Sequence, residues 1–328
     1  MYSHKTEQLQ MWAWAAGAMT APLAYYAGRC HWVLVLFTGA LCSVICQYVL
    51  EAKENAVCRA VWYNGLQFIW LGVALGEMVK WSALCWPSDS GIAAALILLI
   101  LAAAAAVCGK ERIAGVCSVL MWGIAILYII LLAAGISNLH PEWLNVREPL
   151  LEDYPVGLIF IFLIPLGKRM LCPSKSKKAW IGMGTMVLFG TLLAIWTIGG
   201  LSQSGSRSYA FPFYEFGKSL QLVGSVKRFE SLIAVALTAG FFALESMLLT
   251  ISAELAENVK QGIGQKGIWL GALIAAVTAI LGFDSEGIVL GAGSLLFWGL
   301  QPFCTIQKEK IKSRKKEKKA LDNVENEW

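Results

Sequence analysis

Hydrophobic and charged positions are separated into long blocks along the chain. Ten windows contain no Asp, Glu, Lys or Arg, and several reach the roughly 20 residues that a helix needs to cross the hydrocarbon core of a membrane. The windows cover residues 8–28, 30–50, 60–76, 90–109, 113–139, 154–167, 179–206, 231–244, 267–283 and 287–307. Lipid-facing β-strands would alternate apolar and polar residues, and runs such as 92–107 show no alternation. The pattern predicts an all-α polytopic membrane protein with about ten transmembrane helices.

Composition agrees with this interpretation. Apolar residues make up 57% of the 328 positions and charged residues only 15%, with a mean hydropathy of +0.61, so lipid must be the main solvent of the surface. We expect a permease domain over residues 1–307 and a charged cytoplasmic tail over 308–328. The tail is basic first and then acidic, and such a cluster beside a membrane usually fixes topology or contacts anionic lipid. The bilayer is therefore an expected partner, and nucleic acid is not.

The distribution of basic residues predicts the orientation. With the N-terminus in the cytoplasm, 20 Lys and Arg residues lie on the cytoplasmic side and seven outside, as the positive-inside rule requires. A missing or additional span would exchange the sides of all later loops, so this bias also supports the segmentation. We expect both termini to be cytoplasmic. The outer connection 203–228 contains an amphipathic stretch that can form short helices on the outer face.

Catalytic and metal-binding motifs are missing from the sequence. It contains no P-loop, no H-E-x-x-H and no G-x-S-x-G. The three histidines, His4, His31 and His140, lie at predicted helix ends or in loops, and the nine cysteines are scattered singly without a C-x-x-C pair. We therefore expect neither an enzyme nor a bound cofactor or metal.

Two predicted helices contain residues that interrupt helices. The first window has Gly17 near its middle, followed by Thr20 and Pro22, and the short sixth window contains Pro155 and Gly157. Transporters with two inverted repeats bind substrate at the bilayer midplane, where the first helix of each repeat is discontinuous. We therefore predict a five-plus-five inverted repeat, with halves at about 8–139 and 150–307. Proline and glycine are also common in continuous membrane helices, so unbroken helices are the alternative.

A site of this kind needs few charged side chains. Free carbonyl groups hold the ammonium of an amino acid, and free N–H groups at a helix N-terminus hold its carboxylate. Phe160 is a candidate aromatic gate, although a membrane Phe or Trp more often serves packing. The candidate binding residues are Gly17, Ala18, Thr20 and Pro22 of the first span, Gln67 and Trp70 of the third, Gly157 and Phe160 of the sixth, and Thr238 of the eighth.

Three charged residues are candidates for gating or coupling. Glu245 continues the eighth window, and we expect it nearer the cytoplasmic side of the membrane. A carboxylate at the bilayer centre costs about 2.5–3.5 kcal/mol on insertion scales. Glu245 is therefore either a proton-coupled switch or the partner of a basic residue, or else an acid that reaches the interface. Arg228 and Glu230 are expected at the outer mouth, as a gate, an ion pair or a helix start.

Three segments of the chain resemble a known family. They are QLQMWAWAAGAMTAPLAYYAGRCHW near the start, LNVREPLLEDYPVGLIFIFLIPL through the sixth window, and FPFYEFGKSLQLVGSVKRFESLIAVALTAGFFALES around the eighth, with Arg228, Phe229 and Glu230 at its centre. They resemble the endospore germination permeases, which are the B subunits of nutrient germinant receptors in the amino acid, polyamine and organocation transporter superfamily.

The resemblance implies a ten-helix fold of the leucine-transporter type in the bacterial cytoplasmic membrane or the spore inner membrane. It also implies binding of a small nutrient, often an amino acid, beside receptor A and C subunits. Two functions remain open at this stage. The chain is either a subunit that senses a germinant and triggers germination, or a secondary amino-acid transporter.

Overall fold

The computed structural model describes residues 2–29, 31–49, 61–86, 89–145, 162–163, 177–220, 229–282 and 288–300, and its regular elements are helices. The longer helices are α1 (Tyr2–Tyr26), α2 (Trp32–Val49), α3 (Val61–Ala83), α4 (Gly91–Val107), α5 (Lys110–Gly135), α7 (Lys177–Leu201), α10 (Phe229–Val259) and α11 (Gly264–Ile280). The shorter ones are α8 (Gln203–Arg207), α9 (Pro212–Ser219), α12 (Ile288–Ser294), the 3₁₀ turns η1 (Ile136–Asn138) and η2 (Pro141–Leu144), and the π-helix η4 (Leu295–Leu300).

The helices follow the hydrophobic windows closely. Nine of the ten windows contain a helix, and the described part of the sixth window is limited to Phe162 and Leu163. Three described helical stretches, Lys110–Asn138, Gly184–Leu201 and Glu230–Val259, are long and apolar enough to cross a membrane, and three shorter apolar helices accompany them. The chain is therefore a helical membrane protein. The count of ten spans and the inverted repeat stay predictions.

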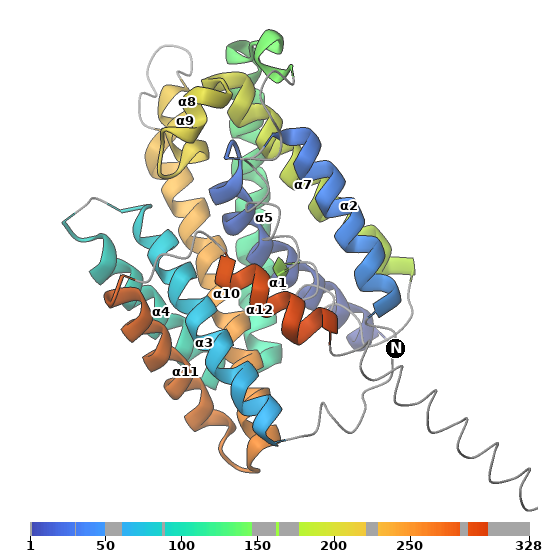
Figure 1. The fold of residues 1–328 in the computed structure, drawn as a ribbon, viewed down its shortest axis with the longest axis vertical. Coiled ribbons are helices and arrows are strands. Elements are labelled where there is room, and N and C mark those ends of the chain that lie inside the picture. The colour runs from blue at the N-terminus through green and yellow to red at the C-terminus, as the bar shows by residue number, and fades with distance from the viewer. Residues whose placement is uncertain are drawn as a thin grey trace, which may run out of the picture.

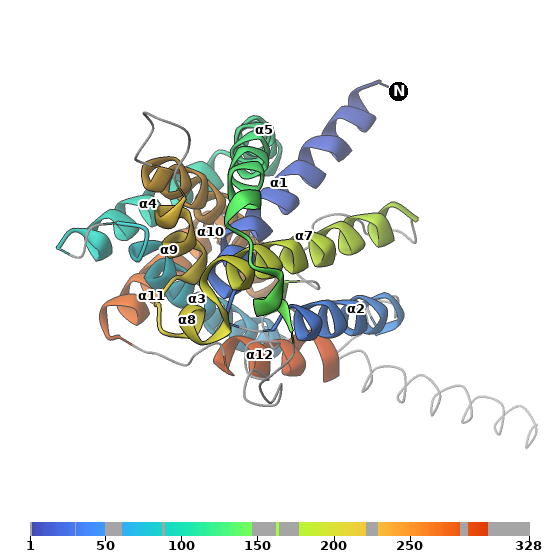
Figure 2. The same ribbon diagram turned by 90° about the horizontal axis from the view of Figure 1, so that it is seen from above.

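Helix α1 runs through the middle of the molecule, between α5, α7 and α10 (Figures 1 and 2). Small residues allow α1 to occupy this central position. Ala15, Ala18 and Ala21 are fully buried, and their short side chains let the neighbouring helices approach closely. The indole Nε1 of Trp14 donates a hydrogen bond of 3.0 Å to the carbonyl of Ala243 in α10. The first helix is thus fixed to a helix that follows more than 200 residues later.

The other helices form two groups around α1. Helices α2 and α7 lie side by side, and α3, α4 and α11 pack together against α10 (Figure 2). Helices α3 and α11 make an especially close contact. A Cβ atom added to Gly76 of α3 would lie 2.6 Å from the Cβ of Thr278 and 2.9 Å from the carbonyl oxygen of Ala275. Only glycine allows this separation, as at other membrane helix interfaces built on small residues.

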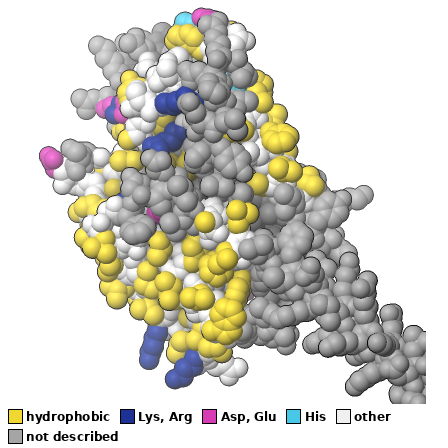
Figure 3. All heavy atoms as spheres, in the orientation of Figure 1, with side chains coloured by type: hydrophobic (Ala, Val, Ile, Leu, Met, Phe, Trp, Pro, Cys, Tyr) yellow, Lys and Arg dark blue, Asp and Glu magenta, His cyan; other side chains and the backbone are white. Residues whose placement is uncertain are grey.

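The outer surface of the bundle is suited to lipid. Figure 3 shows one face, on which hydrophobic side chains cover the middle and lower parts between Lys and Arg side chains at the lower end and near the top. Helix α5 illustrates this exposure, because Val119, Trp122 and Ile129 are each more than 60% exposed. In water such a surface would aggregate, whereas in a bilayer it lowers the free energy. This agrees with an integral membrane protein.

Contacts at the two ends of the bundle agree with the predicted loops. Lys110 at the start of α5 lies 3.5 Å from Glu254 near the end of α10, and both belong to segments assigned to the cytoplasmic side. Arg29 donates a hydrogen bond to the carbonyl of Ala210, and both belong to segments assigned to the outside. The structure therefore places the two segments of each pair at the same end of the bundle. Which end faces the cytoplasm stays a prediction.

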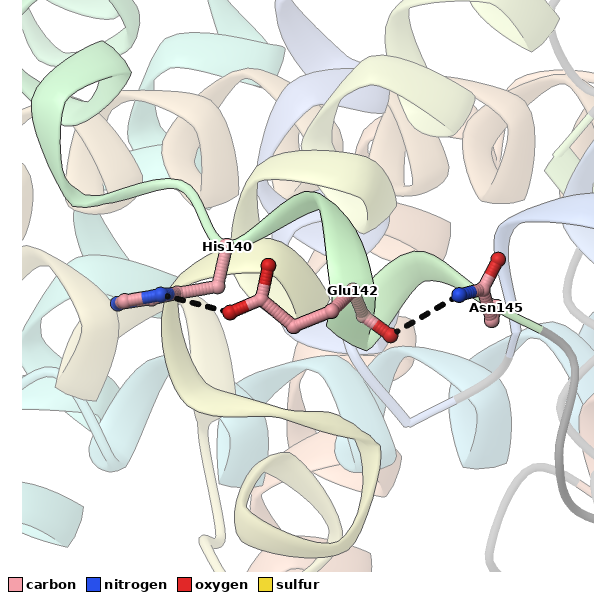
Figure 4. A network of polar contacts seen from close by, with 3 residues as sticks. All are labelled: His140, Glu142 and Asn145. Atoms are coloured by element: carbon pink, nitrogen blue, oxygen red, sulfur yellow. Dashed lines mark hydrogen bonds and ion pairs between the residues drawn. The ribbon is translucent and has the colours of Figure 1, made fainter.

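The connection after α5 contains a small network of polar contacts among His140, Glu142 and Asn145 (Figure 4). His140 Nδ1 lies 3.2 Å from a carboxylate oxygen of Glu142, and the side-chain amide of Asn145 donates to the backbone carbonyl of Glu142. The backbone N–H of His140 donates to the carbonyl of Gly199 in α7, and Trp32 of α2 donates to the carbonyl of Leu144. These bonds tie the connection to the ends of α2 and α7.

Candidate functional site

Helix α1 is continuous where the sequence predicts an interruption. A single α-helix runs from Tyr2 to Tyr26 and contains Pro22, so the prediction of an unwound segment at Gly17, Thr20 and Pro22 is wrong. The hydroxyl of Thr20 donates to the carbonyl of Gly17 at 2.7 Å, which turns this side chain back onto its own helix. Packing by neighbouring helices keeps a membrane helix intact around a proline, and α5, α7 and α10 do so here.

The small residues of α1 serve close packing. A Cβ atom on Gly17 would lie 3.4 Å from the Sδ of Met121 in α5. A Cβ atom on Gly240 of α10 would lie 2.8 Å from the Thr20 hydroxyl and 2.9 Å from the Cβ of Ala21. Ala18 is also fully buried. Gly17 and Thr20 therefore lie in close contacts with α5 and α10, and Ala18 and Pro22 are buried on the same helix.

On α3, both candidates are buried, and Trp70 contacts the predicted sixth span. Gln67 and Trp70 are both buried, and the Trp70 ring meets the ring of Phe162 edge to face at 5.8 Å. Trp70 also contacts Phe297 of the π-helix η4, with ring centroids 5.3 Å apart. The structure thus brings α3, part of the sixth window and η4 together around one indole. Phe162 was not among the candidates, although it follows the predicted Phe160 by two positions.

Three of the candidates lie outside the described residues, namely Gly157, Phe160 and Arg228. Thr238 is described and half-buried on α10. It precedes Gly240 by two positions, which corresponds to about 200° around a helix. Since Gly240 contacts Thr20, Thr238 points to a different face of α10. The described contacts therefore do not join Thr238 to the candidates of α1.

Glu245 lies near the centre of α10, with 16 residues of the helix before it and 14 after it. Because α10 continues to Val259, Glu245 is not at the end of the helix, and its depth relative to the cytoplasmic side stays a prediction. Its side chain is 0% exposed, and neither carboxylate oxygen has a hydrogen-bond partner within the described parts of the chain. A fully buried side chain does not reach the interface. This excludes the alternative of an acid that extends to the membrane surface.

Ionisable side chains are scarce on two of the helices that pack against α10, namely α4 and α11. Leu249 and Ser252, which follow it by one and two turns on the same face of α10, contact Gly271 of α11. Within the bounds of α11 the single ionisable residue is Lys266, in the first turn, and α4 has none. Helix α3 adds a second buried carboxyl group, Glu77, which is 3% exposed.

Glu77 was missed as a candidate because it lies three residues before Lys80, which suggests an ordinary surface pair. A signal was nevertheless present in the sequence. Glu77 follows Trp70 by seven positions, so both residues lie on one face of α3. Both are buried in the structure.

Glu230 lies in the first turn of α10 and lines a cleft at the predicted outer end. The cleft has a volume of about 400 Å³, between the end of α3, the segment before α9, α9 itself and the start of α10. Its charged and aromatic lining consists of Trp86, Phe211, Tyr214, Glu215, Lys218 and Glu230. The expectation that Glu230 lies at an outer mouth agrees with this position.

These features define a class of protein: a helical membrane protein with a buried, unpartnered carboxyl group at membrane depth and a polar cleft at one end. The family described as spore germination protein matches residues 68–283, from α3 to the end of α11. This match covers about two thirds of the chain, and the protein therefore belongs to the spore germination protein family. A comparison with curated proteins found no match.

Proposed function

We propose that this protein is the permease-like subunit of a spore germinant receptor, which binds a small nutrient within the bilayer and thereby triggers germination. Membership of the spore germination protein family supports the role in germination. The observation that carries the binding role is Glu245, a fully buried carboxyl group without a partner among the described residues. Ionisable residues at membrane depth are costly and typically mark a path for substrate, ions or protons.

An amino acid is the proposed class of nutrient. Its two charges can be held by backbone dipoles, so the site needs few charged side chains. We place it beside Gln67 and Trp70 of α3, and Gly157 and Phe160 stay the predicted contribution of the sixth window. The contact between Trp70 and Phe162 supports this placement. Glu245 would couple occupancy to protonation, and Arg228 and Glu230 would act at the outer entrance.

A secondary amino-acid transporter is the second candidate function. Glu245 favours it as well, since a buried carboxyl group is a common element of proton-coupled transport. The two functions differ in whether the solute crosses the membrane. Uptake of labelled amino acids into proteoliposomes that contain this chain alone would support the transporter, and binding without uptake would support the receptor subunit.

A thermal-shift screen of the detergent-solubilised protein against amino acids, sugars and nucleosides tests the proposal. A true ligand at 100 times its Kd stabilises the folded state by about 2.7 kcal/mol, which gives a clear increase in Tm. We expect the increase with amino acids. No shift with any class of solute would contradict the binding role.

Two variants locate the site in the same screen. Gln67→Met keeps the approximate volume of the side chain but removes its amide, and we expect it to lose the ligand-induced shift. Trp122→Ala removes an aromatic side chain that is 71% exposed on α5, and it should keep the shift. The receptor A and C subunits are the proposed partners, and co-purification with them from the spore inner membrane tests the assembly.

A further inference from the structure

Among its described lining residues, the outer cleft holds two acidic side chains and one basic side chain. Glu215 and Lys218 of α9 form an ion pair with a distance of 2.7 Å between Lys218 Nζ and Glu215 Oε1. Glu230 has no ion pair or hydrogen bond with any other described residue, although its charge reaches Lys218 and Tyr214. Among the lining residues that the structure describes, two carboxylates accompany one lysine, and that lysine is paired with Glu215. The carboxylate of Glu230 is therefore available to pair with a cation.

The cleft also contains aromatic faces suited to an ammonium group. The Lys218 ammonium lies 4.6 Å from the centre of the Tyr214 ring, within the range of a cation–π interaction. Partial burial alone would lower the pKa of Lys218, but its hydrogen bond and attraction to Glu215 outweigh burial, so the pKa is raised. The protein's own lysine thus demonstrates that a carboxylate and a tyrosine ring in this cleft stabilise a primary ammonium.

The floor of the cleft is connected to α1. Phe211 lines the cleft and packs edge to face against Tyr25 at 5.3 Å. The Tyr25 ring is stacked on Trp81 of α3, with ring centroids 4.4 Å apart. The guanidinium group of Arg29 also lies over the Tyr25 ring, 4.4 Å from its centre. Helix α9 lies over the upper end of α10 in Figure 1, and it contacts both α10 and α1. A ligand in the cleft would therefore rest against the end of α1.

We propose that the outer cleft is a binding site for a small molecule with a primary ammonium group, which pairs with Glu230 and lies against the aromatic lining. A volume of about 400 Å³ falls within the usual range of ligand pockets. The site lies at the outer end of the bundle, apart from Gln67 and Trp70. It stands whether or not a nutrient binds deeper in the membrane.

Calorimetric titration of the full-length protein in detergent at pH 7 tests this site with three probes. L-alaninamide has an ammonium but no carboxylate, N-acetyl-L-alanine has a carboxylate but no ammonium, and KCl supplies an inorganic cation. We expect binding of L-alaninamide alone, weakened by added NaCl because the site is partly exposed. No binding of L-alaninamide, binding of N-acetyl-L-alanine, or equal competition by K⁺ would overturn the proposal.

Three variants complete the test. Glu230→Gln should weaken L-alaninamide binding at least tenfold without lowering Tm, because Glu230 is a partly exposed residue of a first helical turn. Glu254→Gln removes a carboxylate at the opposite end of α10 and should leave binding unchanged. Gln67→Met, which addresses the deeper nutrient site, should also leave it unchanged. Equal affinity in Glu230→Gln and the wild type would overturn the proposal.

Discussion

Glu245 combines two properties that oppose each other energetically. It lies at the centre of a membrane helix, and its carboxyl group has no hydrogen-bond partner among the described residues. Burying a polar group without a partner costs roughly 2–7 kcal/mol, and an isolated charge costs far more. A residue with only a packing role would be replaced by an apolar one at a gain in stability. The cost is therefore explained best by function.

Replacing Glu245 by glutamine separates the two effects. The amide keeps the shape of the side chain and cannot ionise, so we expect Glu245→Gln to have a Tm equal to or above that of the wild type. Affinity for the ligand found in the thermal-shift screen should differ between pH 5 and pH 8 in the wild type and should not differ in the variant. Titrations at both pH values provide the measurement.

The matched control is Glu254→Gln, on the same helix. Glu254 is about 42% exposed and pairs with Lys110, so its replacement should preserve the pH dependence. A Glu245→Gln protein with wild-type affinity and response from pH 5 to 8 would end the coupling hypothesis.

At the scale of elements, the contact between α3 and α11 depends on glycine. A methyl group at position 76 would overlap the Thr278 side chain and the backbone of Ala275. Because the backbone carbonyl cannot rotate away, Gly76→Ala should push the helices apart and cost about 1–3 kcal/mol, as overpacking of a close interface usually does. The temperature at which the purified protein loses half of its monodisperse fraction would fall measurably.

Gly65 provides the control on the same helix, since a Cβ atom there would meet no atom within 4 Å. Alanine is favoured over glycine within helices by up to about 1 kcal/mol. Gly65→Ala should therefore match or exceed the stability of the wild type. An equal loss of stability in both variants would mean that the close contact between α3 and α11 is not the cause of the loss.

Elements were predictable from sequence to different degrees. Hydrophobic windows predicted the positions of nine helices, and the amphipathic outer stretch agrees with α9, which begins at Pro212. The charge-free window that predicted α10 stops at residue 244, before Glu245, whereas the helix continues to Val259. The break in α1 was predicted from Pro22, a local feature, whereas the continuity of α1 depends on Gly240 and other residues that are distant in the sequence.

The candidate site shows the same limit. The burial of Gln67 and Trp70 follows from their place in an apolar window, but the contact between Trp70 and Phe162 depends on how the helices are arranged. Cleft formation at Glu230 depends on α9 and the end of α3 meeting the start of α10, and no sequence pattern records that meeting. Hydrophobic periodicity determines which residues are buried, and tertiary packing determines which of them touch.

At the scale of the whole molecule, the bias in basic residues gives a testable orientation. Cys108 is exposed at the end of α4, at the end predicted to be cytoplasmic, and Ser208 is exposed at the opposite end. In a chain whose other cysteines are replaced, Cys108 should react with a membrane-impermeant maleimide only after the membrane is opened. A protein with Ser208→Cys as its single cysteine should react in intact cells. The reverse pattern would invert the topology.

The central position of α1 has a consequence for biosynthesis. The carbonyl that accepts the Trp14 hydrogen bond belongs to Ala243, 229 positions later in the chain. Ribosomes add about 5–20 residues per second, so this acceptor emerges about 11–46 seconds after its donor. Throughout that interval the alanine-rich face of the first helix must rest against lipid, the insertion machinery or earlier-made neighbours. A nascent chain that stalls before α10 would expose that face, a surface that membrane quality control could recognise.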